Sequence, residues 1–118
     1  MAYRTDRYVL DEHGEPRPEP DLFVWADWFE RTQRDGSRVV KQDYVEGGAG
    51  QIGVSTVFLG LDHNWRATGP PVLWESLVFG TSLDGEMQRY TSKAAAIEGH
   101  KALVARVAEA WRREHPPA

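Results

Sequence analysis

Two segments of the chain carry apolar side chains at the three- and four-residue spacing of an α-helix. The first is expected to begin after Asp21, an N-cap whose carboxylate accepts from free backbone N–H groups, and to end at Gly36. Its predicted buried face consists of Leu22, Trp25, Ala26 and Phe29. The second is predicted from about Lys93 to Glu114, with a stripe facing the sheet that comprises Ile97, His100, Val104, Val107 and Trp111.

Between the two predicted helices, the pattern changes to strand formers interleaved with polar residues. Four segments show it, over residues 37–45, 51–61, 72–79 and 86–90. Apolar residues on both faces of the second segment indicate a central strand. Because hairpin-length connections favour antiparallel pairing, we predict an antiparallel β-meander of about four strands, with one helix before it and one long helix after it. This is an α+β fold, and we expect both helices on one face of the sheet.

The first 20 residues form a separate N-terminal arm. Tyr8-Val9-Leu10 can make a short strand. Pro16, Pro18 and Pro20 exclude a helix or a central strand and indicate a stiff connector. A chain of 118 residues suits one domain, which we assign to residues 21–115.

Composition narrows the function classes. The formal net charge of −4 argues against a protein that binds duplex DNA through its phosphates, and the absence of cysteine excludes disulfides and thiolate chemistry. No apolar run approaches the length of a membrane span or a signal-peptide core, so we expect a cytoplasmic protein. The Gly47-Gly48-Ala49-Gly50 loop precedes a strand rather than a helix and does not predict a nucleotide cofactor.

Glu75 is the first candidate for chemistry, because strand alternation places it beside apolar Leu73, Leu77 and Phe79. A carboxylate buried among them must be paired, protonated or functional. Two interpretations follow. Either this face is open to solvent or covered by another chain, or Glu75 belongs to a buried polar site in which Arg89 can lie across the ladder.

A second candidate is the run Asp62-His63-Asn64-Trp65-Arg66 after the predicted central strand. Loops at strand ends often display ligand-binding groups. Trp65 could stack on a base or another ring, and Arg66 could hold a phosphate or carboxylate. The alternative is a turn in which Asp62 and Asn64 cap local backbone and Trp65 covers the edge of the core.

Metal binding has little support in the sequence. The four histidines show no His-x-x-x-His spacing, and a site built from Asp62, His63 and Glu75 would be rich in oxygen ligands. We therefore expect no metal and no cofactor. His100, on an apolar helical stripe, is expected to be a hydrogen-bonded core histidine.

Five tryptophans are many for a domain that can fully bury two or three of them. Because tryptophan is enriched at interfaces, the excess indicates a partner surface or a ligand pocket. If the helices cover one sheet face, the other keeps an apolar patch that a second copy of the chain could cover. We therefore expect a homo-oligomer, most simply a dimer.

Several motifs resemble a family of small proteins found in tailed phages and prophages. The similarity spans about residues 20–107, and includes residues 54–64 (VSTVFLGLDHN), 69–71 (GPP), 73–80 (LWESLVFG), 89–92 (RYTS) and 98–100 (EGH). The family pattern carries Asp62, His63 and Glu75. The resemblance implies a phage origin, and with it the cytoplasm of the host cell as the place of action. It also implies an accessory role outside the core replication machinery, and it supplies no catalytic mechanism.

The predicted function is therefore that of a small phage-type accessory protein that acts by binding. Its ligand would be a host protein or a small signalling molecule such as a nucleotide, with a counter-defence role as one setting. The binding residues we assign are Asp62, His63, Asn64, Trp65, Arg66, Glu75 and Arg89. Two alternatives stay open: a small enzyme with His63 and Glu75 as an acid–base pair, assisted or not by a metal in hydrolysis, and a structural homo-oligomer or virion-associated component.

Overall fold

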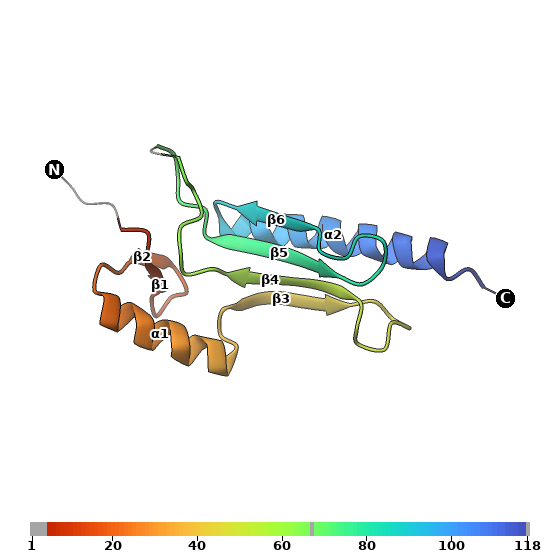
Figure 1. Cartoon of the computed structure of the whole chain (residues 1–118), viewed down its shortest axis with the longest axis horizontal. Helices are drawn as coiled ribbons and strands as arrows, with labels where there is room; N and C mark the ends of the chain where they lie inside the picture. Colours follow the sequence, from red (N-terminus) through yellow and green to blue (C-terminus); the bar gives the residue numbers. More distant parts are fainter. Residues whose placement is uncertain (1–4, 67, 118) are drawn as a thin grey trace.

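The computed structural model describes residues 5–66 and 68–117, and its elements follow the predicted order (Figure 1). Two short strands come first, β1 (Tyr8–Leu10) and β2 (Pro16–Pro18), followed by α1 (Leu22–Asp35). The main sheet is formed by β3 (Val39–Tyr44), β4 (Gly53–Phe58), β5 (Trp74–Phe79) and β6 (Met87–Tyr90). The long helix α2 (Lys93–Glu114) closes the fold.

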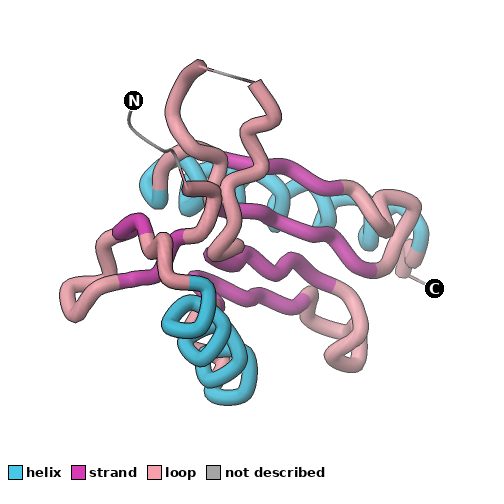
Figure 2. The backbone as a smooth tube through the Cα atoms, turned by 60° about the vertical axis from the view of Figure 1, so that its left-hand side comes forward, coloured by secondary structure: helices cyan, strands magenta, loops and turns pink. Residues whose placement is uncertain are grey.

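The four-stranded sheet confirms the predicted meander. Its strands lie in the order β3-β4-β5-β6, and every neighbouring pair is antiparallel. Helix α2 contacts all four strands, and Figure 2 shows it behind the sheet, so one face of this sheet is covered by a single helix. The α+β class and the positions of both helices in the chain are therefore as predicted.

Helix caps explain why both helices begin and end where the sequence places them. The Asp21 carboxylate accepts from the backbone N–H groups of Phe23 and Val24, and Gly36 ends α1 in the left-handed conformation with φ 74°. Ser92 caps α2 by accepting from Ala95 N–H. These local signals need no tertiary context, which is why the sequence locates both helices closely.

The core lies between α2 and the sheet face that it covers. Val54 and Phe58 of β4 point to this side together with Trp74 and Val78 of β5, and all four are buried. The buried positions of α2 differ from the predicted stripe: they are Ala96, His100, Leu103, Val107 and Ala110, whereas Ile97, Val104 and Trp111 are half-buried. Two of the buried positions are alanines, Ala96 and Ala110, which a search for large apolar side chains misses.

The expectation that both helices share one sheet face is wrong. Helix α1 packs against β1 and the end of the sheet, with the Trp28 ring edge-on to Phe58 at 6.0 Å between ring centroids. Its buried residues are Trp28 and Thr32, whereas the predicted contact residues Leu22 and Ala26 are exposed. Trp25 and Phe29, the other two residues of the predicted stripe, are half-buried and pack against the core, so the contacting face overlaps the predicted one and is shifted toward Trp28 and the polar Thr32.

Arg38 fastens α1 to the sheet. This buried residue donates from Nε to Thr32 Oγ1 at 3.0 Å and from Nη1 to the Phe58 carbonyl at 3.4 Å, and also donates to the Gln33 side chain. Its guanidinium lies 4.0 Å from the Phe29 ring centroid, in a cation–π contact. Burial lowers the pKa of the Arg38 guanidinium below its ordinary value.

The proline-rich segment is part of a β-hairpin rather than only a connector. Residues Tyr8 to Leu10 pair antiparallel with Pro16 to Pro18, and the arm is tied to the main domain where Tyr8 N–H donates to the Gly60 carbonyl at 2.9 Å. A two-stranded sheet has no central strand, so its outer edge accepts prolines that lack an N–H.

The second face of the main sheet is open. Its apolar residues include Val39, Tyr44, Leu77 and Met87, all exposed. With α1 placed at the end of the sheet rather than on this face, the molecule is long: the radius of gyration is 16.5 Å, against about 13–14 Å for a compact chain of this length.

Candidate functional site

The loop between β4 and β5 is held in shape by two of the predicted site residues. Asp62 is buried, and its Oδ1 accepts from the backbone N–H groups of Asn64 at 2.8 Å and Val72 at 2.9 Å. The Asn64 side chain donates to the carbonyls of Thr68 and Pro70. Asp62 and Asn64 therefore organise the loop by capping local backbone, as one of the two sequence interpretations expected.

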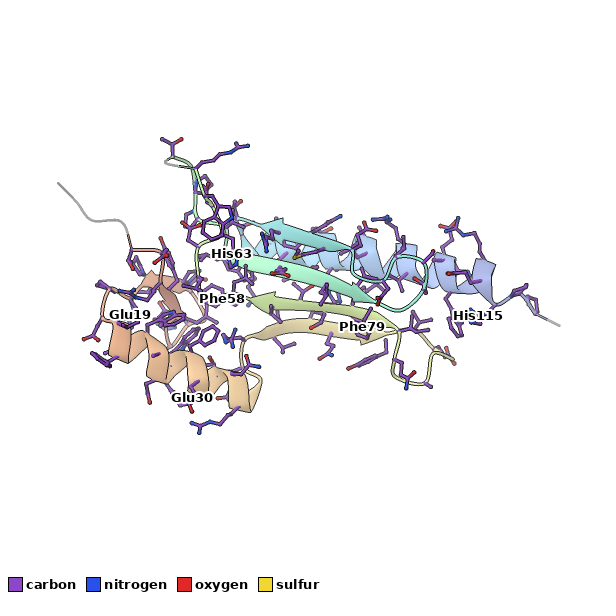
Figure 3. The ribbon with its side chains drawn as sticks, viewed as in Figure 1. Glu19, Glu30, Phe58, His63, Phe79 and His115 are labelled. Atoms are coloured by element: carbon purple, nitrogen blue, oxygen red, sulfur yellow. The ribbon has the colours of Figure 1, made fainter. Side chains whose placement is uncertain are left out.

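Trp65 does not cover the core, as that interpretation also required. Its side chain is 80% exposed at the tip of this loop. His63 lies at the base of the loop (Figure 3), where its Nδ1 is 2.9 Å from the Leu61 carbonyl and its ring meets the Trp65 ring edge-on. His63, Asn64, Trp65 and Arg66 line a cavity of about 440 Å³, which brings four of the seven predicted residues together.

Glu75 and Arg89 lie elsewhere, on the open face of the sheet. They are direct cross-strand partners on β5 and β6, and Arg89 Nε is 3.7 Å from Glu75 Oε2. The Glu75 side chain is only 19% exposed, and its apolar neighbours on this face are Leu77 and Phe79. Leu73, the third expected neighbour, precedes β5 and is buried in the core.

The His63–Glu75 pair is not assembled in this fold. His63 N–H bonds to the Val72 carbonyl, and the three residues from Val72 to Glu75 span about 10 Å of extended chain. Within residues 5–66 and 68–117, no hydrogen bond or ion pair joins the two side chains. Nor do these residues contain three or more His, Asp and Glu side chains grouped to hold a metal ion.

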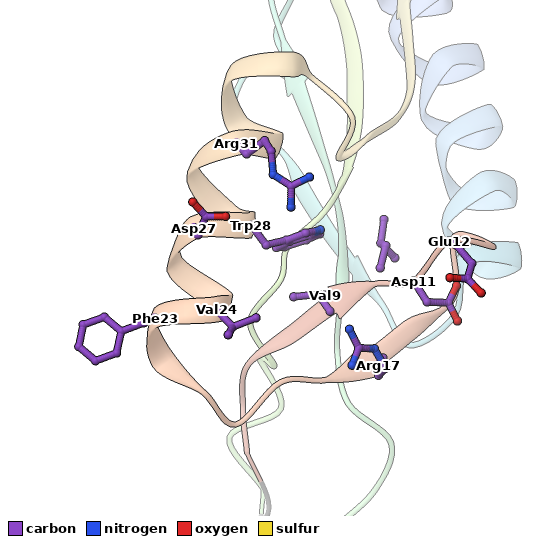
Figure 4. Close-up of a pocket in the computed structure, with 10 residues that line it drawn as sticks. Val9, Asp11, Glu12, Arg17, Phe23, Val24, Asp27, Trp28 and Arg31 are labelled. Atoms are coloured by element: carbon purple, nitrogen blue, oxygen red, sulfur yellow. The ribbon is translucent and has the colours of Figure 1, made fainter.

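A groove that the sequence did not indicate lies between α1 and the β1–β2 hairpin (Figure 4). Its volume is about 910 Å³. Val9 and Trp28 are buried beneath it, and Val24 adds an exposed apolar side chain. Its remaining lining is mainly charged, with both signs represented: Asp11, Glu12 and Asp27 are acidic, whereas Arg17 and Arg31 are basic.

A chain of hydrogen bonds crosses the buried side of the sheet. His100 on α2 is fully buried, with Nε2 2.7 Å from Asp43 Oδ2 and Nδ1 2.6 Å from Thr56 Oγ1. Thr56 is 2.5 Å from Ser76 Oγ, to which the Tyr90 hydroxyl donates at 3.0 Å. This chain connects all four strands with α2 and confirms His100 as a hydrogen-bonded core histidine.

The donor and acceptor capacities of these groups set which of them donates in each hydrogen bond of this series. A carboxylate only accepts, so His100 donates from Nε2 to Asp43, and a neutral imidazole then accepts at Nδ1. With the imidazole in this neutral form, Thr56 donates to His100, Ser76 donates to Thr56, and Tyr90 donates to Ser76. Every hydroxyl in the chain is thus used, and donors aligned in one direction strengthen one another.

Sequence reasoning missed this chain of hydrogen bonds, although the sequence gives some indication of its residues. Thr56 and Ser76 are polar residues at positions whose strand neighbours are apolar, and His100 lies on an apolar helical stripe. Gly99 gives a further signal, because a side chain there would meet the Tyr90 ring within 2.3 Å. Recognising the chain required the pairing of strands and helix, which no local pattern supplies.

Within the described residues, none of the helices is both long and apolar enough to cross a membrane. Comparison of the whole chain with protein-family models, with curated proteins and with solved structures finds no match. The resemblance to phage proteins therefore rests on the motifs alone, and the case for a function rests on the geometry of this molecule.

Proposed function

We propose that this chain is a small accessory protein that acts by binding a protein partner, without catalysis, through the end of the molecule that carries the loop 62–71 and the first turn of α1. Figure 1 shows both segments at the same end of the long axis. The observation that carries the proposal is the exposure of two large aromatic side chains there, Phe23 at 84% and Trp65 at 80%.

Exposed aromatic side chains on ordered backbone suit protein recognition. Tryptophan anchors contribute strongly to interfaces when they enter a partner's pocket. The bonds from Asp62 and Asn64 fix the loop before binding, which reduces the entropy lost on association. The nearby groove adds an apolar floor beneath charges of both signs, which suits a partner segment with apolar anchors flanked by Lys or Arg and by Asp or Glu.

The phage resemblance makes a host protein the natural partner, and counter-defence one setting for it. A nucleotide-like ligand is the alternative at the same end, with the ring on Trp65 and the phosphate on Arg66. We favour the protein because Phe23 and the groove form a second exposed region at this end, separate from the cavity beside Trp65, and a single nucleotide would fill only one of the two. The separation of His63 from Glu75 makes acid–base catalysis by that pair the less favoured alternative.

Site-specific photo-crosslinking in bacterial cells tests this proposal. A photo-reactive amino acid would be placed at position 23, at position 65, or at exposed position 109 on α2 as the control. We expect one protein to crosslink from positions 23 and 65 but not from 109, and its recovery to fall when Trp65→Ala is combined with the probe at position 23. Identical products from all three positions, or a bound nucleotide in native mass spectra instead of a protein, would reject it.

A second proposal concerns the open sheet face, where exposed Val39, Tyr44, Leu77 and Met87 form an apolar surface across β3 to β6. We propose that a second copy of the chain covers this face in a homodimer. Molar mass from light scattering should be twice 13.4 kDa for the wild type and 13.4 kDa for Leu77→Asp. Phe23→Asp, at the other surface, is the control that should leave the dimer intact. A wild-type protein that stays monomeric at high concentration would end this proposal.

A further inference from the structure

A cavity lies at the opposite end of the molecule from Trp65, between the end of β3 and the C-terminal half of α2. Its volume is about 380 Å³, within the usual range for small-molecule sites. Val54 and Val107 form its buried wall, and Val104, Ala108 and Trp111 extend the apolar lining along the helix. The cavity exists because β3 is an edge strand whose helix-facing side chains include polar Lys41 and Asp43, which do not close the core against α2.

Asp43 gives this apolar cavity a fixed acceptor. Its Oδ2 is held by the fully buried His100 at 2.7 Å, so the position of the carboxylate is set by the hydrogen-bond chain described above. The side chain is nevertheless 45% exposed, and no group in the described part of the chain donates to Oδ1. One oxygen is therefore committed to the protein, and the other is available to a ligand.

Trp111 supplies an aromatic wall and a donor. One face of its ring is stacked on His115 at 3.5 Å between ring centroids, which orients the indole. No acceptor among residues 5–66 and 68–117 takes its indole N–H. The cavity thus presents a planar ring, an N–H donor and a carboxylate acceptor around aliphatic walls.

The charges around the cavity select the sign of the ligand. Asp43 and Glu46 contribute two negative charges, and Arg112 contributes one positive charge. An anion would meet the two carboxylates at the cavity, whereas a protonated amine would bind the free oxygen of Asp43. The apolar walls and the indole favour a flat ring on the remainder of the molecule.

We propose that this cavity is a binding site for a small aromatic amine, with the ring against Trp111 and the aliphatic walls and the protonated nitrogen on Asp43. The site is independent of the protein-binding end of the molecule, so either proposal can fail alone. A cation bound to Asp43 would draw negative charge from the carboxylate and weaken the hydrogen bond that it accepts from His100, a change that the hydrogen-bond network would carry as far as Tyr90.

A matched pair of probes tests the site. Tryptamine and indole-3-acetate share the indole ring and carry opposite charges, so their difference isolates the role of Asp43 and Glu46. In ¹H–¹⁵N NMR titrations of the full chain, we expect tryptamine to shift the Trp111 indole N–H and the amides of residues 43–46, with a Kd of about 1 mM or below. Indole-3-acetate should bind at least about tenfold more weakly.

Three variants complete the experiment. Asp43→Asn keeps an oxygen acceptor for His100 but removes the charge, and Glu46→Gln removes the second charge without touching the buried chain; tryptamine affinity should fall at least about tenfold with the first and less with the second. Asp84→Asn, in the β5–β6 turn, is the charge-matched control and should leave affinity unchanged. Equal binding of both probes, shifts confined to other residues, unchanged affinity in both Asp43→Asn and Glu46→Gln, or no shifts with either probe would overturn the proposal.

Discussion

Replacing Thr56 by valine is the sharpest test of the buried hydrogen-bond chain, because valine keeps the shape of threonine and removes only its hydroxyl. Thr56 Oγ1 lies 2.6 Å from His100 Nδ1 and 2.5 Å from Ser76 Oγ, and all three residues are fully buried. In Thr56→Val, the imidazole nitrogen loses its donor and the Ser76 hydroxyl loses its acceptor. Because both groups are fully buried, bulk solvent does not replace the lost partners.

The expected loss of stability follows from these two groups. A buried polar group left without its partner costs about 1–3 kcal/mol, so two cost about 2–6 kcal/mol. The added methyl group offsets about 0.8 kcal/mol of this cost. We expect the free energy of unfolding to fall by about 1–5 kcal/mol, a large part of the roughly 5–15 kcal/mol typical of a whole domain.

Urea denaturation followed by tryptophan fluorescence measures this change, with an unchanged m-value as the sign that both states keep their compactness. Ser55→Val is the control, since Ser55 directly precedes Thr56 in the same strand but points to the open face. Its effect should stay within about 0.5 kcal/mol. Ser76→Ala completes a double-mutant cycle with Thr56→Val, for which we expect a coupling of at least about 0.5 kcal/mol. A Thr56→Val protein as stable as Ser55→Val would refute the reasoning.

Four further predictions concern separate parts of the molecule. Trp65→Ala should change the free energy of unfolding by less than about 0.5 kcal/mol. It should weaken partner binding by about 2 kcal/mol or more, which titration calorimetry measures once the partner is known. Asp62→Ala should cost about 1–3 kcal/mol and make the loop after β4 the first site of limited proteolysis; uncleaved loops would contradict it. Gly99→Ala should be strongly destabilising because its new methyl group meets the Tyr90 ring, and Tyr90→Leu should restore part of the loss in a thermal melt. Hydrogen bonds from the backbone N–H groups of Glu15 and His13 lower the pKa of Asp11 below 3.8. The ionised Asp11 carboxylate therefore stabilises the hairpin above about pH 4, and this stabilisation is lost as pH falls through the lower pKa of the folded state. The NMR chemical shift of the Glu15 amide should follow this titration, and the Asp11 contribution to it should disappear in Asp11→Asn.

Local signals in the sequence account for most of the predicted fold. Asp21, Gly36 and Ser92 locate helix ends because capping depends on neighbouring residues only. Strand alternation likewise separates the two faces of β5, with Trp74 on the buried side and Glu75 on the open side. The faces of the helices were harder to predict, because Thr32 and two alanines, Ala96 and Ala110, are buried at positions that a search for large apolar side chains does not indicate.

The candidate site was predictable in part for the same reason. Residues 62–66 are consecutive, so their gathering around one loop follows from the chain itself. The pairing of Glu75 with Arg89 required the register of β5 and β6, and sequence reasoning could name it only as one alternative. The partnership of Asp43 with His100 joins residues 57 positions apart, and only the packing of α2 on β3 reveals it.

The elongated shape of the molecule has a consequence for how its assembly is observed. A radius of gyration of 16.5 Å is that expected for a compact protein of about 200 residues, well above the 118 of this chain and close to the length of two copies. Gel filtration reports size in solution rather than mass, so a single chain would leave the column early and pass for a dimer. Sedimentation would show the same chain as slow for its mass, and the two measurements together would distinguish an extended monomer from a compact pair.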